Sequence, residues 1–326
     1  MLLGKPQRFI VFIVIVFAVV IVVISFNQKR GLNHYKNMSA GRIDKFEWLP
    51  PDTSQLSVLK DGELILYGRD LIANTSFYLG PKGIVAAITN GMNCQNCHLN
   101  AGTKYLGNNY SSVYATYPKF RTRSGSIENI QKRVNDCMQR SLNATSVLDS
   151  AGKEMKAIIA YIKWLGEKVP QNISPDGSGI VNLPFLKRPA DPEKGKMIYT
   201  IKCQRCHGAN GEGILRIDST GYIYPPLWND RSYTTAAGLF RISRLAGFVR
   251  NNMPFDAPQN SSPLTDEEAW DVAAFVNSQP RPDRKFSKDW PDIASKPFDF
   301  PFGPYADGFS EKQHKYGPFE PIKNYK

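Results

Sequence analysis

Two copies of one short cysteine and histidine pattern stand out in the chain. The residues are Cys94, Cys97 and His98 in the first copy, and Cys203, Cys206 and His207 in the second. In the C-x-x-C-H pattern, two thiols bond to the edge of a porphyrin and the adjacent histidine binds its iron. Redox dithiols of the thioredoxin type need a βαβ context, which is not visible here. The sequence therefore predicts two covalently bound c-type haems.

The second motif has one main candidate for the opposite side of its iron. Met253, followed by Pro254, lies beyond His207, and a thioether ligand is typical of cytochromes that transfer electrons. Met197 competes, but it precedes the motif, and Met253 could also be an ordinary packing residue. We expect His207 and Met253 to hold this iron.

The first motif leaves three candidates, namely Cys137, Met138 and Met155. Met155 belongs to an apolar helix face and is expected in the core. Neighbours on a helix point about 100° apart, so Cys137 and Met138 cannot both face the iron. From these residues alone, either is acceptable, and if Met138 is the ligand, Cys137 is only a buried thiol.

The surroundings of Cys137 favour a site for an anion. A helix is expected over 126–142, and Arg133, Cys137 and Ser141 recur on it every four residues, so they share one face. Further basic residues lie near by in the sequence, namely Lys119, Arg121, Arg123 and Arg140. Cationic neighbours bias a thiol toward thiolate, which is the better nucleophile and iron ligand. A basic helix can be a plain solvated face, but this stripe is typical of a small-oxyanion site.

The expected helices place each motif in a repeated frame. Residues 61–74 and 153–169 carry helical patterns on either side of the first motif. Before the second, Asp191 can cap a helix that has Pro192 at its first position, and a capping box at 265–268 opens the closing helix. This order is that of a class I cytochrome c domain. We expect an all-α fold with two such domains in tandem after an N-terminal transmembrane helix.

The expected segments are an anchor at 1–30, an active-site haem domain at 31–182, a relay haem domain at 183–285 and an extended tail at 286–326. The tail is rich in proline and in aromatic residues. Because so many aromatic residues argue against a solvated tail, we expect it to pack on both domains.

The uncharged stretch 9–26 sets the expected compartment. As a helix it reaches roughly 27 Å, close to the thickness of a bilayer core, and no convincing cleavage site follows it. Because c-type haem is attached outside the cytoplasm, the domains are expected on the periplasmic side of the bacterial inner membrane. The net charge of +12 suits anionic partners, but no motif supports nucleic acid.

With these features the sequence resembles the dihaem thiosulfate dehydrogenases, which also act as tetrathionate reductases. The similar segments are 67–72, 93–99, 101–103, 121–125, 133–143 and 301–307. The segment 133–143 is the most specific, because ordinary cytochromes c have no reason to carry it. The resemblance covers nearly everything after the anchor.

The resemblance implies that two thiosulfates are coupled to tetrathionate, or tetrathionate is cleaved back, with two electrons exchanged. The implied iron ligands are His98 and Cys137 for the active-site haem, and His207 and Met253 for the relay haem. The residues implied to bind the sulfur oxyanions beside Cys137 are Arg123, Arg133 and Ser141. A redox partner such as another cytochrome c or a quinone-linked membrane complex is expected.

One residue departs from the family pattern. Some members have a lysine directly before the relay methionine, where this chain has Asn252, which has no amine.

Two other functions stay open, a membrane-anchored dihaem electron carrier without substrate chemistry and a dihaem peroxidase. The second ligand of the first haem iron distinguishes the three functions. A thiolate indicates the dehydrogenase, a methionine the electron carrier and a labile group the peroxidase.

Overall fold

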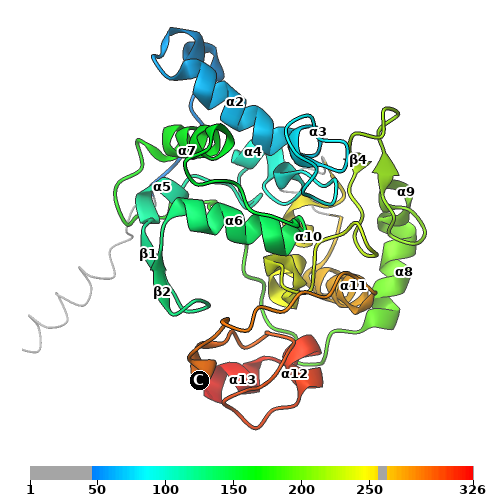
Figure 1. Cartoon of the computed structure of the whole chain (residues 1–326). Coiled ribbons are helices and arrows are strands. Elements are labelled where there is room, and N and C mark those ends of the chain that lie inside the picture. The colour runs from blue at the N-terminus through cyan, green and yellow to red at the C-terminus, as the bar shows by residue number, and fades with distance from the viewer. Residues whose placement is uncertain (1–45, 256–262, 326) are drawn as a thin grey trace, which may run out of the picture. The chain divides into compact units, whose positions relative to one another are not determined.

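Each half of the chain is organised around two packed helices (Figure 1). The computed structural model describes residues 46–255 and 263–325. In the first half α2 (Gly62–Ala73) packs along α7 (Lys153–Gly166), and in the second half α8 (Pro192–Lys202) packs along α11 (Asp266–Ser278). These are the four helices that the sequence predicts to flank the haem motifs, so the predicted helical frame is present in both halves.

A glycine allows the close packing of each helix pair. A Cβ on Gly68 of α2 would lie 2.0 Å from the carbonyl oxygen of Ala157 in α7. A Cβ on Gly195 of α8 would lie 1.9 Å from the carbonyl oxygen of Asp271 in α11. Any larger residue must push the two backbones apart. A glycine at the point of contact therefore allows the paired helices to pack closely in both domains.

The predicted helix caps of the second domain are present. The side chain of Asp191 accepts hydrogen bonds from the backbone of the first turn of α8, with Pro192 at its start. The Thr265 side chain accepts from Glu268 N at 3.1 Å, and the Glu268 carboxylate accepts from Thr265 N at 2.8 Å. Both caps satisfy backbone N–H groups that have no partner within the helix.

Shorter elements connect these helices and carry the motifs. In the first domain they are η1 (Thr53–Val58), α3 (Thr75–Leu79), η2 (Cys94–Asn96), α4 (Leu99–Gly102), α5 (Val113–Thr116), β1 (Lys119–Arg121), β2 (Ser126–Glu128) and α6 (Ile130–Ser141). In the second they are α9 (Gln204–His207), β3 (Ile214–Leu215), β4 (Tyr222–Tyr224), η3 (Gly238–Phe240) and α10 (Ile242–Asn252). Strand β1 pairs with β2 and β3 with β4, both antiparallel. The described protein is therefore mostly helical, with two short ladders that the all-α expectation omits.

The helix expected over 126–142 is shorter than predicted. Residues 126–128 form β2, because Gly125, with a φ of +61°, turns the chain back along β1. Asn129 then caps α6 by accepting a hydrogen bond from Lys132 N at 2.9 Å. The helix starts only after this cap, which leaves the stripe of Arg133, Cys137 and Ser141 intact.

Two hydrophobic cores lie in the one compact unit that extends from Phe46 to Lys326. The first is built mainly from α2 and α7, and the second from α8, α10 and α11. The C-terminal segment is not extended throughout, since it contains η5 (Ile293–Ser295), α12 (Glu311–Tyr316) and α13 (Glu320–Tyr325). Phe319 and Ile322 join the second core, because their burial removes large apolar side chains from water.

None of the helices within 46–255 and 263–325 is long and apolar enough to cross a membrane. The anchor predicted at 9–26 lies outside the described residues.

Candidate functional site

The first motif borders a cavity of about 290 Å³ in the first domain. The motif contributes Cys94, Cys97 and His98 to its walls, and α6 contributes Arg133, Cys137 and Ser141. The three α6 residues thus share one face, as predicted. The structure brings them to the same cavity as the expected haem-binding histidine.

The contacts of His98 leave one ring nitrogen available for a metal. Its Nδ1 lies 2.6 Å from the carbonyl oxygen of Asn108. A carbonyl only accepts, so Nδ1 carries the proton and Nε2 keeps its lone pair. Burial lowers the pKa of His98 to about 4, so the ring is neutral at neutral pH. The ring also stacks on Tyr110, with centroids 4.5 Å apart.

The second motif has the same arrangement. It borders a cavity of about 420 Å³, lined by Cys203, Cys206, His207 and Met253 among others. His207 Nδ1 lies 2.9 Å from the carbonyl oxygen of Pro225, and burial lowers the pKa of His207. A thiol pair and an oriented imidazole at the wall of each cavity fit the attachment of a c-type haem.

Of the two methionines considered for the second iron, only Met253 faces the cavity. It follows directly after α10 and lines the wall together with His207. Met197 on α8 is 61% exposed. Asn252, the residue before Met253, directs its Nδ2 to the carbonyl oxygens of Phe248 (2.9 Å) and Leu106 (3.1 Å), away from the cavity wall.

The three sulfur residues considered for the first iron also differ in their positions relative to the first cavity. Met155 is fully buried in the core formed by α2 and α7 and does not line the cavity. Cys137 and Met138 both border it, while Met138 also packs into the core. The position of Met155 therefore matches the expectation of a core residue.

The two cavities are neighbours. Asn93 and Cys97 line both of them, and Gln95 and Asn96 of the first motif also border the second cavity. Electrons pass more readily between cofactors that lie close together. A shared wall therefore suits electron transfer between the two haems.

Positive charge surrounds Cys137. A thiolate at Cys137 is the main cause that raises the pKa of the Arg133 guanidinium, so the two side chains lie close enough to stabilise each other. Lys119 also lines the cavity, and its pKa is lowered by burial and then by Arg121 and Arg133. A lysine whose pKa is lowered by neighbouring arginines is stabilised in its charged form when an anion binds near by.

Among the residues predicted for the site of the first domain, Arg123 alone does not line this cavity. Its guanidinium lies 5.5 Å from the ring centroid of Trp290, and its carbonyl accepts a 2.7 Å hydrogen bond from Trp290 N. Burial, followed by Arg140 and Arg133, lowers its pKa to about 10. Arg123 therefore adds to the positive potential from behind the cavity wall.

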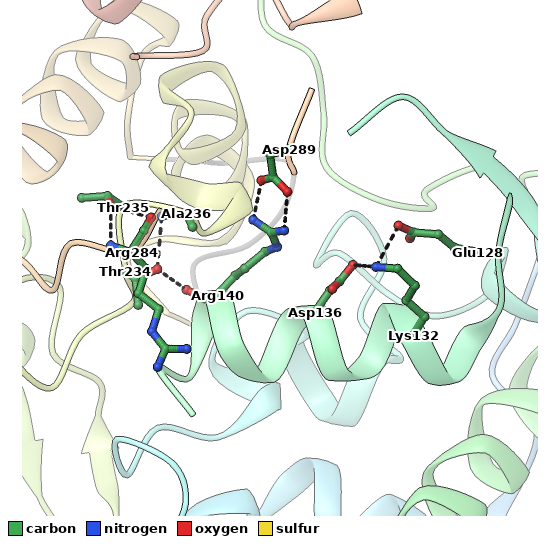
Figure 2. Close-up of polar contacts among 9 residues, drawn as sticks. All are labelled: Glu128, Lys132, Asp136, Arg140, Thr234, Thr235, Ala236, Arg284 and Asp289. Carbon is green, nitrogen blue, oxygen red and sulfur yellow. Dashed lines mark hydrogen bonds and ion pairs between the residues drawn. The ribbon is translucent and has the colours of Figure 1, made fainter. Parts of the chain in front are cut away.

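The C-terminal end of α6 is clamped by the second domain and the tail, as Figure 2 shows. Arg140 forms a two-pronged ion pair with Asp289, at 2.6 and 2.7 Å. Its carbonyl oxygen accepts hydrogen bonds from Thr234 N and Oγ1. Arg284 donates to the carbonyl oxygen of Ala144 at 2.9 Å. These contacts hold the helix that carries Cys137.

One cationic residue of the lining is not predicted by the sequence. Arg244 of α10 reaches the first-domain cavity from the second domain. Basic residues lie at 241, directly before α10, and at 244 and 250 within it, but the sequence has no signal for a contact between domains. Such a residue is found only after the two domains are placed against each other.

Known proteins share this organisation. The family described as SoxA/TsdA, cytochrome c domain, matches residues 85–170, and the cytochrome c family matches residues 192–280. The thiosulfate dehydrogenase of Psychrobacter arcticus is 36% identical over 242 residues, which cover 74% of this chain and 71% of the relative. The thiosulfate dehydrogenase of Allochromatium vinosum is also 36% identical, over 68% of this chain and 79% of the relative.

A solved structure agrees with these relatives. The thiosulfate dehydrogenase (TsdBA) from Marichromatium purpuratum is 30% identical, with a TM-score of 0.68 over 74% of this chain and 51% of that one. The match thus spans about half the length of that protein. The two cytochrome c domains with their cysteine pairs carry two c-type haems. The chain therefore belongs to the thiosulfate dehydrogenase family, in which a SoxA/TsdA cytochrome c domain is joined to a second cytochrome c domain.

Proposed function

We propose that this protein interconverts thiosulfate and tetrathionate at the cavity of its first domain, coupling two thiosulfates with the release of two electrons. The observation that carries the proposal is the stripe of Arg133, Cys137 and Ser141, which lines the same cavity as His98. The names of the curated relatives support the same reaction.

Cys137 supplies the reacting sulfur in this proposal. Its thiolate forms a bond with the outer sulfur of one thiosulfate, and the pair gives up two electrons. The outer sulfur of the second thiosulfate then attacks the sulfur bound to Cys137, which breaks that bond, releases tetrathionate and restores the thiolate. Each haem, when bound, takes up or returns one electron, so the two together match the two-electron change.

The charged side chains hold the dianionic substrates. Arg133 lies beside the Cys137 thiolate, where its planar guanidinium can donate two hydrogen bonds to a sulfonate. Ser141, one turn beyond Cys137 on α6, offers a hydroxyl donor to the same group. Arg123 acts through its charge from outside the lining, and this weakens the repulsion between two dianions that must approach each other.

The ligand sets follow from the same cavities. We assign His98 and Cys137 to the active-site haem, and His207 and Met253 to the relay haem. Met138 is the competing ligand for the first iron, since it borders the cavity as well. A carrier that used Met138 would leave Cys137 and its arginines without a role.

Assays of the purified protein in both directions test the proposed function. Thiosulfate oxidation is followed with ferricyanide as acceptor, and tetrathionate reduction with a reduced viologen as donor. Turnover in both directions is expected. An electron carrier would show neither reaction, and a peroxidase would instead consume peroxide.

The cellular setting is a separate part of the proposal. We infer that residues 9–26 anchor the protein in the bacterial inner membrane with both domains in the periplasm, where another cytochrome c or a quinone-linked complex exchanges electrons with the relay haem. The support is the uncharged stretch in the sequence and the need to attach c-type haem outside the cytoplasm. Recovery of a soluble protein that begins just after residue 26 would contradict the anchor.

A further inference from the structure

The cavity that holds Cys137 is completed by a residue of the other domain. Most of its lining belongs to the first domain, but Arg244 projects into it from α10. Arg133 and Lys119 provide the other two cationic side chains of the lining. Three cations from three separate elements therefore face one cavity.

Arg244 forms no ion pair with any residue that the structure describes. The nearest candidate, Asp299, is already engaged, because it accepts hydrogen bonds from Arg241 Nε at 2.7 Å and from Ser243 Oγ at 2.5 Å. By contrast, Arg250 on the same helix pairs with Asp266 at 2.8 Å. No hydrogen bond or ion pair joins the Arg244 guanidinium to a residue within 46–255 or 263–325.

The electrostatic surroundings of Arg244 also favour an added anion. Its pKa is lowered, first by burial and then by the neighbouring Arg241, and the opposing effect of Asp299 does not cancel this shift. A partly buried guanidinium that forms no ion pair loses hydration, and here it gains in return only the attraction of Asp299, which other side chains already engage. An oxygen anion in the cavity would supply both the charge and the hydrogen-bond acceptors that Arg244 lacks.

The substrate of the proposed reaction has two such groups. Tetrathionate carries a sulfonate at each end, and its two halves are the two thiosulfates. Arg133 is placed beside Cys137, so it suits the sulfonate of the thiosulfate that reacts with the cysteine. Arg244 lies on α10 of the second domain, and the charges that shift its pKa are those of Arg241, Asp299 and Arg121, without a contribution from Cys137.

We propose that Arg244 binds the sulfonate of the second thiosulfate, which is the far sulfonate of tetrathionate, so that the second domain completes the substrate site of the first. This inference rests on the proposed function. The same oxygen-anion chemistry is offered by a carboxylate of the haem, and the experiment separates the two sources.

Equilibrium binding of tetrathionate to the oxidised holoenzyme, measured by calorimetry without an electron donor, tests the inference. Arg244→Ala is expected to weaken binding by about tenfold to a hundredfold, the effect of losing a charge-assisted contact. Arg244→Lys is expected to restore part of the affinity, because it keeps the charge but not the two-pronged geometry. Arg250→Ala removes the same charge from the same helix outside the cavity and is expected to bind as the wild type does.

Three results would overturn the inference. Equal tetrathionate affinity in Arg244→Ala and the wild type would mean that the residue does not touch the substrate. If Arg244→Ala shifts the potential of the first haem without added oxyanion and leaves the tetrathionate affinity unchanged, a haem carboxylate is the anion that Arg244 binds. A wild-type protein that neither binds tetrathionate nor turns it over would instead remove the proposed function itself.

Discussion

Replacing Arg140 by methionine should destabilise the protein by about 2–3 kcal/mol. Methionine keeps much of the apolar stem that packs on Phe286, whose ring centroid lies 3.8 Å from the guanidinium carbon, but removes the two-pronged pair with Asp289. The Arg140 side chain is 6% exposed and that of Asp289 is 18% exposed. Breaking a fully buried pair costs about 3–5 kcal/mol. Water can reach the unpaired Asp289 carboxylate in part, so the expected loss lies at or below the lower end of this range.

Urea unfolding followed by circular dichroism measures this loss of unfolding free energy. Arg140→Met combined with Asp289→Asn should recover about 1–2 kcal/mol, because the unpaired carboxylate is gone. Arg216→Met is the matched control. It breaks an exposed pair with Asp218 at 3.7 Å, where both side chains are more than half exposed, and should cost less than about 0.5 kcal/mol. Equal effects in Arg140→Met and Arg216→Met would refute the reasoning.

Three further predictions concern the cofactors and the helix pairs. Acid–acetone treatment should leave two haems per chain bound, and extraction of the haem would contradict covalent attachment at both motifs. Met253→Leu should change the spectrum and potential of the second haem alone, whereas Met197→Leu, at an exposed position, should change neither. Gly68→Ala should lower the unfolding free energy by about 1–3 kcal/mol, because its Cβ would meet the Ala157 carbonyl oxygen at 2.0 Å. Gly238→Ala, which has nothing within 4 Å of the new Cβ, should change the unfolding free energy by less than about 0.5 kcal/mol.

The parts of this fold that local chemistry determines could be predicted from the sequence. The cap at Asp191 and the capping box at Thr265 depend on a few neighbouring residues, and the structure has both. The stripe of Arg133, Cys137 and Ser141 follows from helical periodicity alone. Its place beside His98 agrees with the haem motif that the same domain carries.

The parts that depend on contacts between distant segments could not be predicted. Residues 126–128 carry a helix-like pattern, but pairing with β1 makes them a strand. The C-terminal segment forms α12 and α13, because burial of Phe319 and Ile322 in the second core outweighs the local effect of its prolines. Arg123 does not line the cavity and instead contacts Trp290 of the C-terminal segment. Arg244 reaches the lining from the second domain.

The assignment of the reacting sulfur is tested most directly by replacing Cys137 with glycine and assaying thiosulfate oxidation and tetrathionate reduction. Because the two directions share one transition state, both activities should disappear together. The variant should still carry two haems, since other cysteines attach them, and only the first haem should lose the features of thiolate ligation. Met138→Leu serves as the control and should keep both activities. Turnover near the wild-type rate in Cys137→Gly would contradict the mechanism and return the protein to the class of electron carriers.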